Sequence, residues 1–280
     1  MPLIDLILNL AGLLLWLSWQ ALGITAATRP TALSLVYTLK RAEPRPPRRR
    51  TPLLFLLALL VGRSVIYWQL GPGAEWRPMV NLGVVTCEFS VTAWGSMLLY
   101  SFLSFGQVLG SYYLALLFVA VANTKTPETD PLQRIVRMQL GGLGRLPMVA
   151  ILLTPGVLGT LLWLVVGWPL GQLGLYRPSP TLEMLWQQAL VFGLGTYLVW
   201  QYFLILLLRV HNFNSYVYLG KAPFWHFLAF TGRNALRPIR WLPLTFGRFD
   251  VTPLLVIGLA LFTGYHWSGW GRWLFGRVPW

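Results

Sequence analysis

The chain alternates between long apolar runs and shorter segments rich in arginine, proline and glycine. An apolar run of about 20 residues can cross a bilayer as an α-helix, because the hydrocarbon core is about 30 Å thick. Six runs meet this requirement: 3–24, 52–69, 93–122, 146–168, 181–208 and 252–270. We therefore predict an all-α integral membrane protein with about six transmembrane helices and short interfacial helices between them.

The tract 79–122 is long enough for two spans, and the basic residues decide between one span and two. The tract itself contains no lysine or arginine. With six spans and the N-terminus outside, 17 of the 22 Lys and Arg residues face the cytoplasm, in the segments 25–51, 123–145 and 209–250. A seventh span would move two of these segments outside, against the positive-inside tendency. We therefore assign 79–92 to the outer surface and 93–122 to one long, tilted helix.

This topology predicts a multi-pass membrane protein, with both termini outside and the basic loops in the cytoplasm. Tryptophans are enriched at membrane–water interfaces. Six of them fall at the predicted outer ends of the spans: Trp68, Trp76, Trp168, Trp267, Trp270 and Trp273. Their positions agree with the orientation that the basic residues indicate.

Composition narrows the class further. Only 11% of the residues are charged, whereas a soluble domain has about a quarter. The net charge of +14 would suggest a nucleic-acid partner in a soluble protein, but basic cytoplasmic loops account for it here. We therefore predict no nucleic-acid partner. The single cysteine, Cys87, excludes an intrachain disulfide and a C-x-x-C redox pair.

Short sequence similarities within the chain predict an internal repeat. Thr51-Pro52-Leu53-Leu54 recurs as Thr252-Pro253-Leu254-Leu255, and Gly144-Arg145-Leu146-Pro147 precedes a span in the middle of the chain. We predict three units, each composed of a span, a basic surface segment and a second span, in parallel orientation. Their boundaries are 1–72, 79–170 and 180–280, and they are expected to pack as one membrane domain.

The middle basic segment has a helical pattern of its own. Its apolar residues follow i, i+3, i+4 and i+8 spacing: Leu132, Ile135, Val136 and Leu140. Arg134 and Arg137 take the other side. This pattern predicts a short amphipathic helix in the inner membrane interface. A loop packed on protein is the alternative interpretation.

The segment from Thr231 to Leu255 combines dense arginines with a fixed order of prolines and glycine. We interpret it as a basic cytoplasmic segment that lies along the membrane surface, turns and re-enters the bilayer. Thr252 suits a helix N-cap and Pro253 suits the first helical position. Asp250 is expected at the start of the last helix, within ion-pair distance of Arg237 or Arg240.

Nine residues of this segment resemble, in their order, the signature of the YggT (YlmG) family of small integral membrane proteins. They are Leu236, Pro238, Ile239, Arg240, Leu242, Pro243, Gly247, Asp250 and Pro253. Thr252 stands where the family has serine, and the proline expected after Thr231 is missing. The resemblance implies a multi-pass inner-membrane protein with a role in membrane organisation, cell division, cofactor assembly or osmotic tolerance.

The basic residues are the main candidates for binding. Arginines suit phosphate groups of anionic lipids and acidic surfaces of other integral membrane proteins, which are the partners that we predict. The candidate residues are Arg233, Arg237, Arg240, Arg248, Asp250, Arg134, Arg137 and Arg63. The alternative is that these arginines serve only to orient the chain in the membrane.

Arg63 is the one strong charge inside a predicted span. An intramembrane charge is a functional candidate, although this one can also snorkel to outer water or to Glu75. Six amide residues in the spans can join helices by hydrogen bonds or line a pore: Asn9, Gln20, Gln107, Gln187, Gln188 and Gln201.

No catalytic or metal-binding constellation is evident, so we predict a non-enzymatic protein without a cofactor or a bound metal. The histidines, His211, His226 and His266, do not offer facing haem ligands at a common depth. The favoured hypothesis is a structural accessory subunit, assembly factor or organiser of a larger membrane complex. A channel or transporter related to osmotic or ion tolerance is the alternative, and a haem or quinone enzyme comes third.

Overall fold

The chain forms two compact units. The first comprises Met1–Val80 and Glu88–Leu109, and the second comprises Asn81–Cys87 and Gly110–Trp280. The computed structural model describes residues 2–27, 50–74, 76–124, 130–176, 181–216, 222–239, 245–246 and 249–277. The segment 31–39, whose sequence suggests a short surface helix, lies outside these residues.

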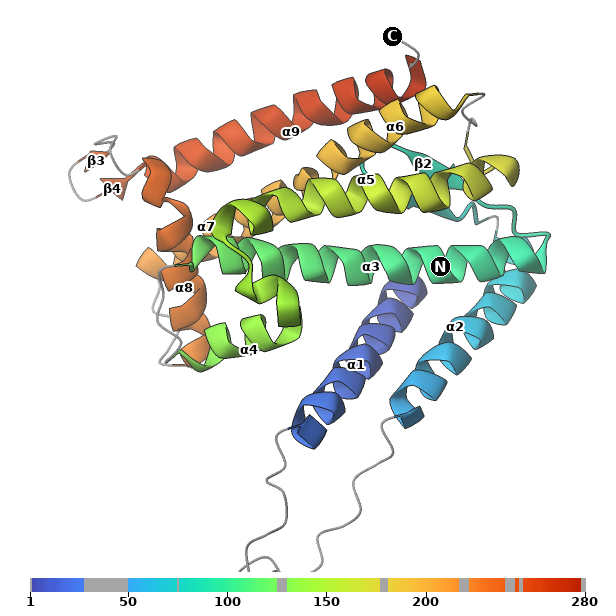
Figure 1. Ribbon diagram of the computed structural model, residues 1–280, viewed down its shortest axis with the longest axis horizontal. Coiled ribbons are helices and arrows are strands. Elements are labelled where there is room, and N and C mark those ends of the chain that lie inside the picture. The colour runs from blue at the N-terminus through green and yellow to red at the C-terminus, as the bar shows by residue number, and fades with distance from the viewer. Residues whose placement is uncertain are drawn as a thin grey trace, which may run out of the picture. The chain divides into compact units, whose positions relative to one another are not determined.

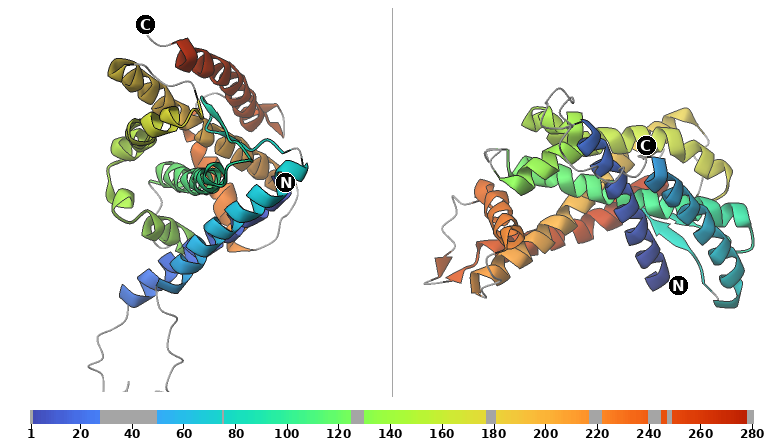
Figure 2. Two further views of the ribbon diagram at one scale, coloured as in Figure 1. Left: turned by 90° about the vertical axis from the view of Figure 1, so that its right-hand side faces the viewer. Right: turned by 90° about the horizontal axis from the view of Figure 1, so that it is seen from below.

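The first unit is built on two long helices and the start of a third. Helices α1 (Pro2–Ala27) and α2 (Arg50–Leu70) lie side by side, and a 3₁₀ turn, η2 (Pro72–Ala74), follows α2 (Figures 1 and 2). The first part of α3 (Trp94–Ala122) completes the unit. Leu56 and Leu60, one helical turn apart, are buried with Phe105 in its apolar core.

A short β-hairpin precedes α3, so the tract 79–122 contains one long helix and not two. Strand β1 (Met79–Asn81) pairs with β2 (Thr86–Glu88). The turn between them places Gly83 at φ +92°, a conformation that a side chain would strain, and the Asn81 side chain accepts a hydrogen bond from the Gly83 N–H. The prediction of a single helix in this tract is therefore confirmed.

The second unit centres on helices α5 (Met148–Gln172), α6 (Leu182–Gly195) and α7 (Tyr197–Tyr216). Helices α5 and α6 pack closely along their length (Figure 1). Trp163 is 1% exposed and stacks on Phe192, with 4.7 Å between the ring centroids. This pair forms the centre of an apolar core that also buries Phe275 of the last helix.

Glycines allow the backbones of α5 and α6 to approach. A Cβ atom on Gly193 would lie 2.5 Å from the carbonyl oxygen of Gly156, and a Cβ on Gly159 would lie 3.1 Å from the Cα of Gly193. Such small-residue contacts are typical of helix pairs in membranes, where close van der Waals packing holds helices together. The contact explains why this apolar segment is rich in glycine.

The span predicted at 181–208 is interrupted at Thr196, where α6 ends and α7 begins. The Thr196 hydroxyl donates to the carbonyl oxygen of Gly193 at 2.7 Å and so competes with the helical hydrogen-bond ladder. Gly193 and Gly195 lower the local helix propensity further. The predicted span is confirmed, since Leu182–Asn214 is long and apolar enough to cross a membrane, but the interruption at Thr196 was not predicted.

The amphipathic segment after α3 forms helix α4 (Pro131–Leu140), followed by the 3₁₀ turn η3 (Gly141–Arg145). The Asp130 carboxylate caps α4 by accepting from the N–H groups of Leu132 and Gln133. The predicted helix is confirmed, but its buried face differs. Gln133 is 1% exposed and Ile135 is 47% exposed, because the helix turns Gln133, Val136 and Leu140 inward.

The long basic loop predicted after α7 contains an additional helix, α8 (Pro223–Ala235), and a 3₁₀ turn, η4 (Arg237–Ile239). Two short strands follow, β3 (Thr245–Phe246) and β4 (Phe249–Asp250), which pair in antiparallel order. The last helix, α9 (Thr252–Arg277), packs against α6 and α7 (Figure 1).

A polar contact joins the end of α3 to α8. The Asn123 amide donates to the Thr231 hydroxyl at 2.8 Å and accepts from the Asn234 amide at 2.8 Å. Thr231 in turn donates to the carbonyl oxygen of Phe227. Asn123 and Thr231 are fully buried, so this contact fixes the position of α8 on the second unit.

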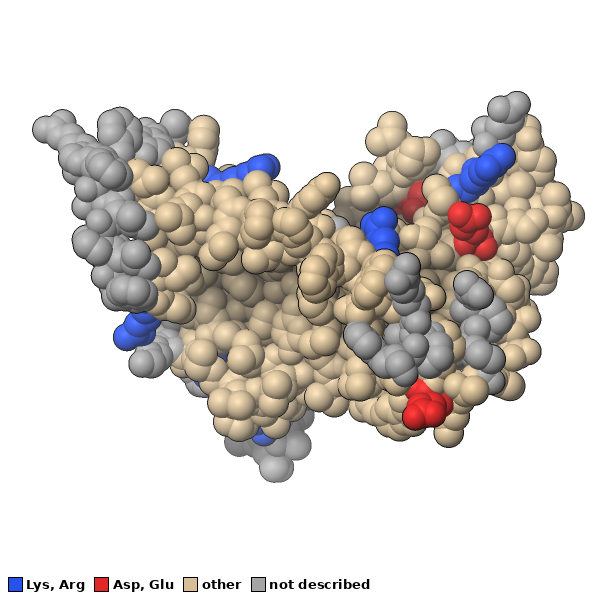
Figure 3. All heavy atoms as spheres, turned by 90° about the horizontal axis from the view of Figure 1, so that it is seen from above, with Lys and Arg blue, Asp and Glu red and all other residues tan. Residues whose placement is uncertain are grey.

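Five segments of the described chain are long and apolar enough to cross a membrane. They are Pro2–Gly23, Arg50–Leu70, Trp94–Ala122, Met148–Gln172 and Leu182–Asn214. The all-α, multi-pass character is therefore confirmed. Helix α9 is not among the five, because polar and aromatic residues fill its second half. Figure 3 shows one face of the protein, on which charged side chains are few and most of the surface is uncharged.

Candidate functional site

Arg63 lies at the centre of a buried polar cluster in the first unit. Its side chain is 1% exposed. The prediction that it snorkels to outer water is therefore wrong, and Glu75, the partner proposed for it, lies outside the described residues. Arg63 instead faces Asp5, with 3.9 Å between a guanidinium nitrogen and a carboxylate oxygen.

Helical spacing brings the cluster together. Asp5 and Asn9 lie one turn apart on α1, and Arg63 and Tyr67 lie one turn apart on α2. Asn9 bonds to Arg63 and Asp5 bonds to Tyr67, so the two helices run in opposite directions at this point. The first part of α3 supplies Ser101 and Ser104, which lie on one helical face.

All three nitrogens of the Arg63 guanidinium donate to protein oxygens. Nη1 donates to the Asn9 side-chain oxygen at 2.6 Å, and Nε donates to the Ser101 hydroxyl at 2.6 Å. Nη2 donates to the Ser101 carbonyl oxygen. The Ser101 hydroxyl in turn donates a hydrogen bond to the carbonyl oxygen of Leu60 at 2.6 Å. Arg63 therefore ties α1 and α3 to its own helix.

The Asp5 carboxylate is surrounded by donors. The Tyr67 hydroxyl donates to it at 2.8 Å, the Asn9 amide at 3.1 Å and the Ser104 hydroxyl at 3.2 Å. The Asn9 amide also donates to Ser104 at 2.8 Å. The Asp5 side chain is 17% exposed, so it is the one member of the ion pair that retains access to the surroundings.

Aromatic rings cover one side of the cluster. Tyr67, Trp76 and Tyr100 contact one another edge to face, with centroid distances between 5.1 and 5.7 Å. Phe89 adds a further ring against Tyr100 at 5.5 Å. Edge-to-face contacts are the favoured geometry of aromatic pairs. Tyr67, Tyr100 and Phe89 are buried, so these rings belong to the apolar interior of the first unit next to the polar cluster.

The arrangement acts chemically as a clamp between helices. A positive and a negative charge neutralise each other, and each keeps several charge-assisted hydrogen bonds. Breaking such a buried pair leaves an uncompensated charge, which typically costs about 3–5 kcal/mol. The cluster therefore specifies how α1, α2 and α3 assemble in the first unit.

The other arginine candidates do not join this cluster. Arg134 is exposed on α4 and Arg137 is half-buried in its last turn. Arg233 is exposed in the last turn of α8, and Arg237 is exposed in η4, where a cation suits the negative end of the helix dipole. Among the described residues, no ion pair joins Arg134, Arg233 or Arg237 to an acidic side chain.

The remaining candidates come from the segment with the YggT-like order. Arg240 and Arg248 lie outside the described residues. The backbone of Asp250 belongs to strand β4, opposite Thr245 and two residues before α9 begins. Its side chain is not among the described ones. The predicted contact between Asp250 and Arg237 or Arg240 therefore stays a prediction.

Two predicted helix-joining amides do join helices. Asn9 belongs to the Arg63 cluster, and the Gln201 amide on α7 donates to the carbonyl oxygen of Ala260 on α9. Gln188 is 2% exposed, but its side-chain oxygen accepts no hydrogen bond from any described residue. Within the described ranges, no three His, Cys, Asp or Glu side chains converge as metal ligands would.

Sequence reasoning identified Arg63 and Asn9 but missed Asp5 as their partner. The available signal was the spacing of Asp5 and Asn9 on the first apolar run, which places both on one helical face. Tyr67 and the two serines carry no sequence signal by themselves, since such residues are common in spans.

Comparisons with known proteins do not assign the chain to a family. No protein-family model, no curated protein and no solved structure matches the chain.

Proposed function

We propose that this chain is a non-enzymatic membrane protein that serves as a structural accessory subunit, assembly factor or organiser of a larger inner-membrane complex. The observation that carries the proposal is the Arg63 cluster. All three guanidinium nitrogens meet protein oxygens, so the strongest charge within the spans joins helices and is not held open for a passing solute.

The outer faces of the spans support the same proposal. Large apolar side chains stay exposed along the long helices, including Leu3 and Ile7 on α1 and Val149 and Val165 on α5. Such faces suit lipid or the helices of other membrane proteins. On α4, Arg134 is exposed beside Ile135 and Met138, a combination that suits anionic head groups next to acyl chains.

The proposal includes a topology of six spans. Helix α9 would be a sixth span, which places both termini outside and the basic loops in the cytoplasm of a bacterial cell. The three parallel repeats and the resemblance of 231–253 to the YggT family would then describe one architecture. Its partners would be anionic lipids and other integral membrane proteins.

Purification from native membranes in a mild detergent tests the proposal. We expect the tagged chain to carry one or more integral membrane proteins in fixed stoichiometry, measured by quantitative mass spectrometry. The competing function, a channel or transporter, is favoured by the partial exposure of Asp5 next to Arg63. It predicts solute or ion flux through the purified chain alone in liposomes.

A matched pair of variants separates the two functions. Arg63→Gln alters the buried cluster, whereas Arg209→Gln makes the same change at an exposed site on α7. Flux that is lost in Arg63→Gln and kept in Arg209→Gln would overturn the accessory-subunit proposal. Stoichiometric partners without flux would support it.

A further inference from the structure

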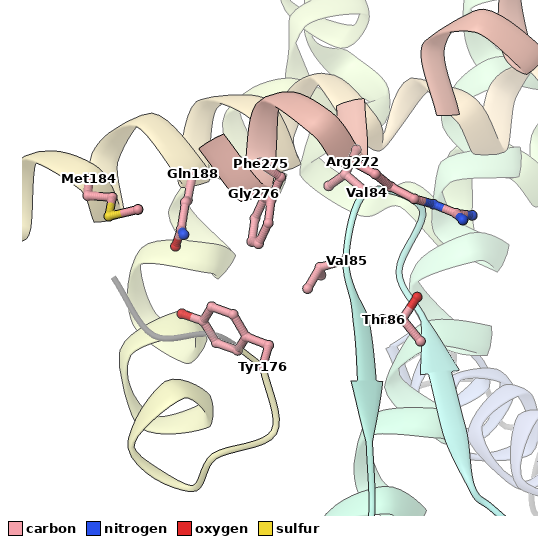
Figure 4. A pocket seen from close by; sticks show the side chains of 9 residues that line it. All are labelled: Val84, Val85, Thr86, Tyr176, Met184, Gln188, Arg272, Phe275 and Gly276. Atoms are coloured by element: carbon pink, nitrogen blue, oxygen red, sulfur yellow. The ribbon is translucent and has the colours of Figure 1, made fainter. Parts of the chain in front are cut away.

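The second unit contains a cavity of about 290 Å³ that does not involve the Arg63 cluster. The hairpin residues Val84, Val85 and Thr86 form one wall, and the ends of α6 and α9 form another. Met184, Phe275 and Gly276 contribute apolar surface (Figure 4). The volume is close to the lower end of the range for small-molecule sites, so the cavity accommodates a small group or the head of a larger molecule.

Two acceptor oxygens lie on one side of this cavity. Gln188 is 2% exposed, and no described residue donates to its side-chain oxygen. Tyr176 lies beside it, and its hydroxyl donates to the carbonyl oxygen of Gly167 at 2.9 Å, which leaves the Tyr176 oxygen as an acceptor. Figure 4 shows both side chains on the same side of the cavity. A buried acceptor without a donor is costly, so this side favours a ligand with O–H or N–H groups.

The opposite side carries a positive charge. Figure 4 shows Arg272 beside Thr86 on the side away from Gln188. Arg272 is exposed and forms no ion pair with a described carboxylate. A guanidinium with free donors binds phosphate oxygens well. The cavity therefore has acceptors at one end, apolar walls between them and an anion-binding group at the other end.

A second hollow adjoins Arg272 along α9. It has a volume of about 320 Å³ and is lined by Tyr265, His266, Gly269, Trp270 and Arg272. Trp270 is 68% exposed, and Tyr265 is 79% exposed. Because the two hollows share Arg272, a molecule with its anion at this residue can place a polar head in the first hollow and an apolar chain along the second.

The depth of the site in its helices fits a lipid head group. Gln188 lies six residues after the start of α6, which corresponds to roughly 9 Å along the helix axis, and Arg272 lies five residues before the end of α9. Both side chains are therefore within about two turns of a helix end, where polar head groups meet the hydrocarbon core.

We propose that this cavity binds the head group of a phospholipid whose head alcohol carries an O–H or N–H donor. The phosphodiester lies at Arg272, and the donor of the head alcohol reaches Gln188. Phosphatidylglycerol and phosphatidylethanolamine both have this chemistry. Phosphatidylcholine has the same phosphodiester but no donor, so the site discriminates against it. The assignment does not depend on the function proposed above.

Native mass spectrometry of the full chain in detergent tests this site. The probes are phosphatidylglycerol, phosphatidylethanolamine and phosphatidylcholine with identical acyl chains. We expect at least one of the two donor-bearing lipids to bind as a single tight copy, with roughly tenfold higher affinity than phosphatidylcholine. Whichever of these two lipids binds more tightly shows whether the site prefers a hydroxyl or an ammonium donor. Equal binding of all three lipids would overturn the proposal.

Adjacent glutamines provide a matched control. Gln188→Leu removes the acceptor and is expected to abolish the preference over phosphatidylcholine, while leaving the fold intact because no described hydrogen bond is lost to Gln188 Oε1. Gln187→Leu makes the same change at a residue that does not line the cavity, and the preference should persist. Arg272→Gln should weaken the binding of all three lipids. An unchanged preference in Gln188→Leu, or an equal loss in Gln187→Leu, would refute the assignment.

Discussion

Breaking the ion pair between Asp5 and Arg63 should destabilise the first unit, and restoring neutrality should recover part of the loss. Unit charges 3.9 Å apart attract each other by about 4 kcal/mol at an effective dielectric constant of about 20. Asp5 is 17% exposed, so its surroundings screen part of this attraction. We therefore expect Asp5→Asn to lower the free energy of unfolding by about 2–3 kcal/mol, slightly below the usual cost of breaking a fully buried pair.

The double variant distinguishes the charge interaction from the hydrogen bonds. Arg63→Gln removes the positive charge and leaves Asn9 and Ser101 with fewer donors, so alone it should cost a similar amount. Combining it with Asp5→Asn leaves no uncompensated charge. The double variant should therefore cost about 2 kcal/mol less than the two single variants together.

Unfolding in mixed micelles, followed by tryptophan fluorescence, measures these free energies. Arg209→Gln is the control, since this exposed arginine should change stability by less than about 0.5 kcal/mol. If the losses of the two single variants simply add in the double variant, the cluster does not act as a charge-based clamp. The same conclusion would follow if Asp5→Asn were as stable as the unaltered protein.

Three further predictions follow from other parts of the chain. Gly193→Ala should destabilise the α5–α6 contact by about 1–3 kcal/mol in a detergent unfolding assay, whereas Gly258→Ala, with open space around the added methyl group, should not. Cys87 is fully buried, and burial raises the pKa of its thiol to about 11, so maleimide at pH 7–8 should label it only after unfolding. Fast labelling of the folded protein would contradict that placement. Single cysteines introduced at Arg49, Lys125 and Lys221 on a Cys87→Ser background should each be labelled from the cytoplasmic side. Labelling of any one of them from the outside would refute the parallel-repeat topology.

The apolar pattern predicted the long helices well, because the length of an apolar run is decided by bilayer thickness. The starts of α2, α5 and α9 fall within two residues of the predicted ones, where Thr-Pro or Leu-Pro precedes the apolar run. The break at Thr196 was not predicted, since it depends on one hydroxyl and two glycines whose effect appears only when α6 packs on α5.

The contents of the polar cluster were only partly predictable. Sequence reasoning identified Arg63 as unusual, but it sought a partner nearby in the chain, whereas Asp5 comes from another helix. Helix α8 was missed because the whole segment 209–250 was interpreted as a basic loop, although α8 itself consists mainly of apolar and aromatic residues. Its position also depends on Asn123, which is far away in the sequence. Ile135 was predicted on the apolar face of α4 but is 47% exposed, whereas Gln133 is buried, since the face that α4 turns inward is decided by its neighbours.

The division of the Arg63 cluster among three helices has a consequence for biosynthesis. An arginine at the centre of a span opposes insertion by about 2.5–3.5 kcal/mol, and α2 reaches the membrane before Ser101 has been synthesised. Helix α1, with Asp5 and Asn9, is already available at that stage. We therefore expect α1 to remain beside the insertion machinery until α2 arrives, so that the two helices enter the lipid as a pair. Emergence of α3 then completes the cluster, which makes the order of synthesis part of how this protein reaches its fold.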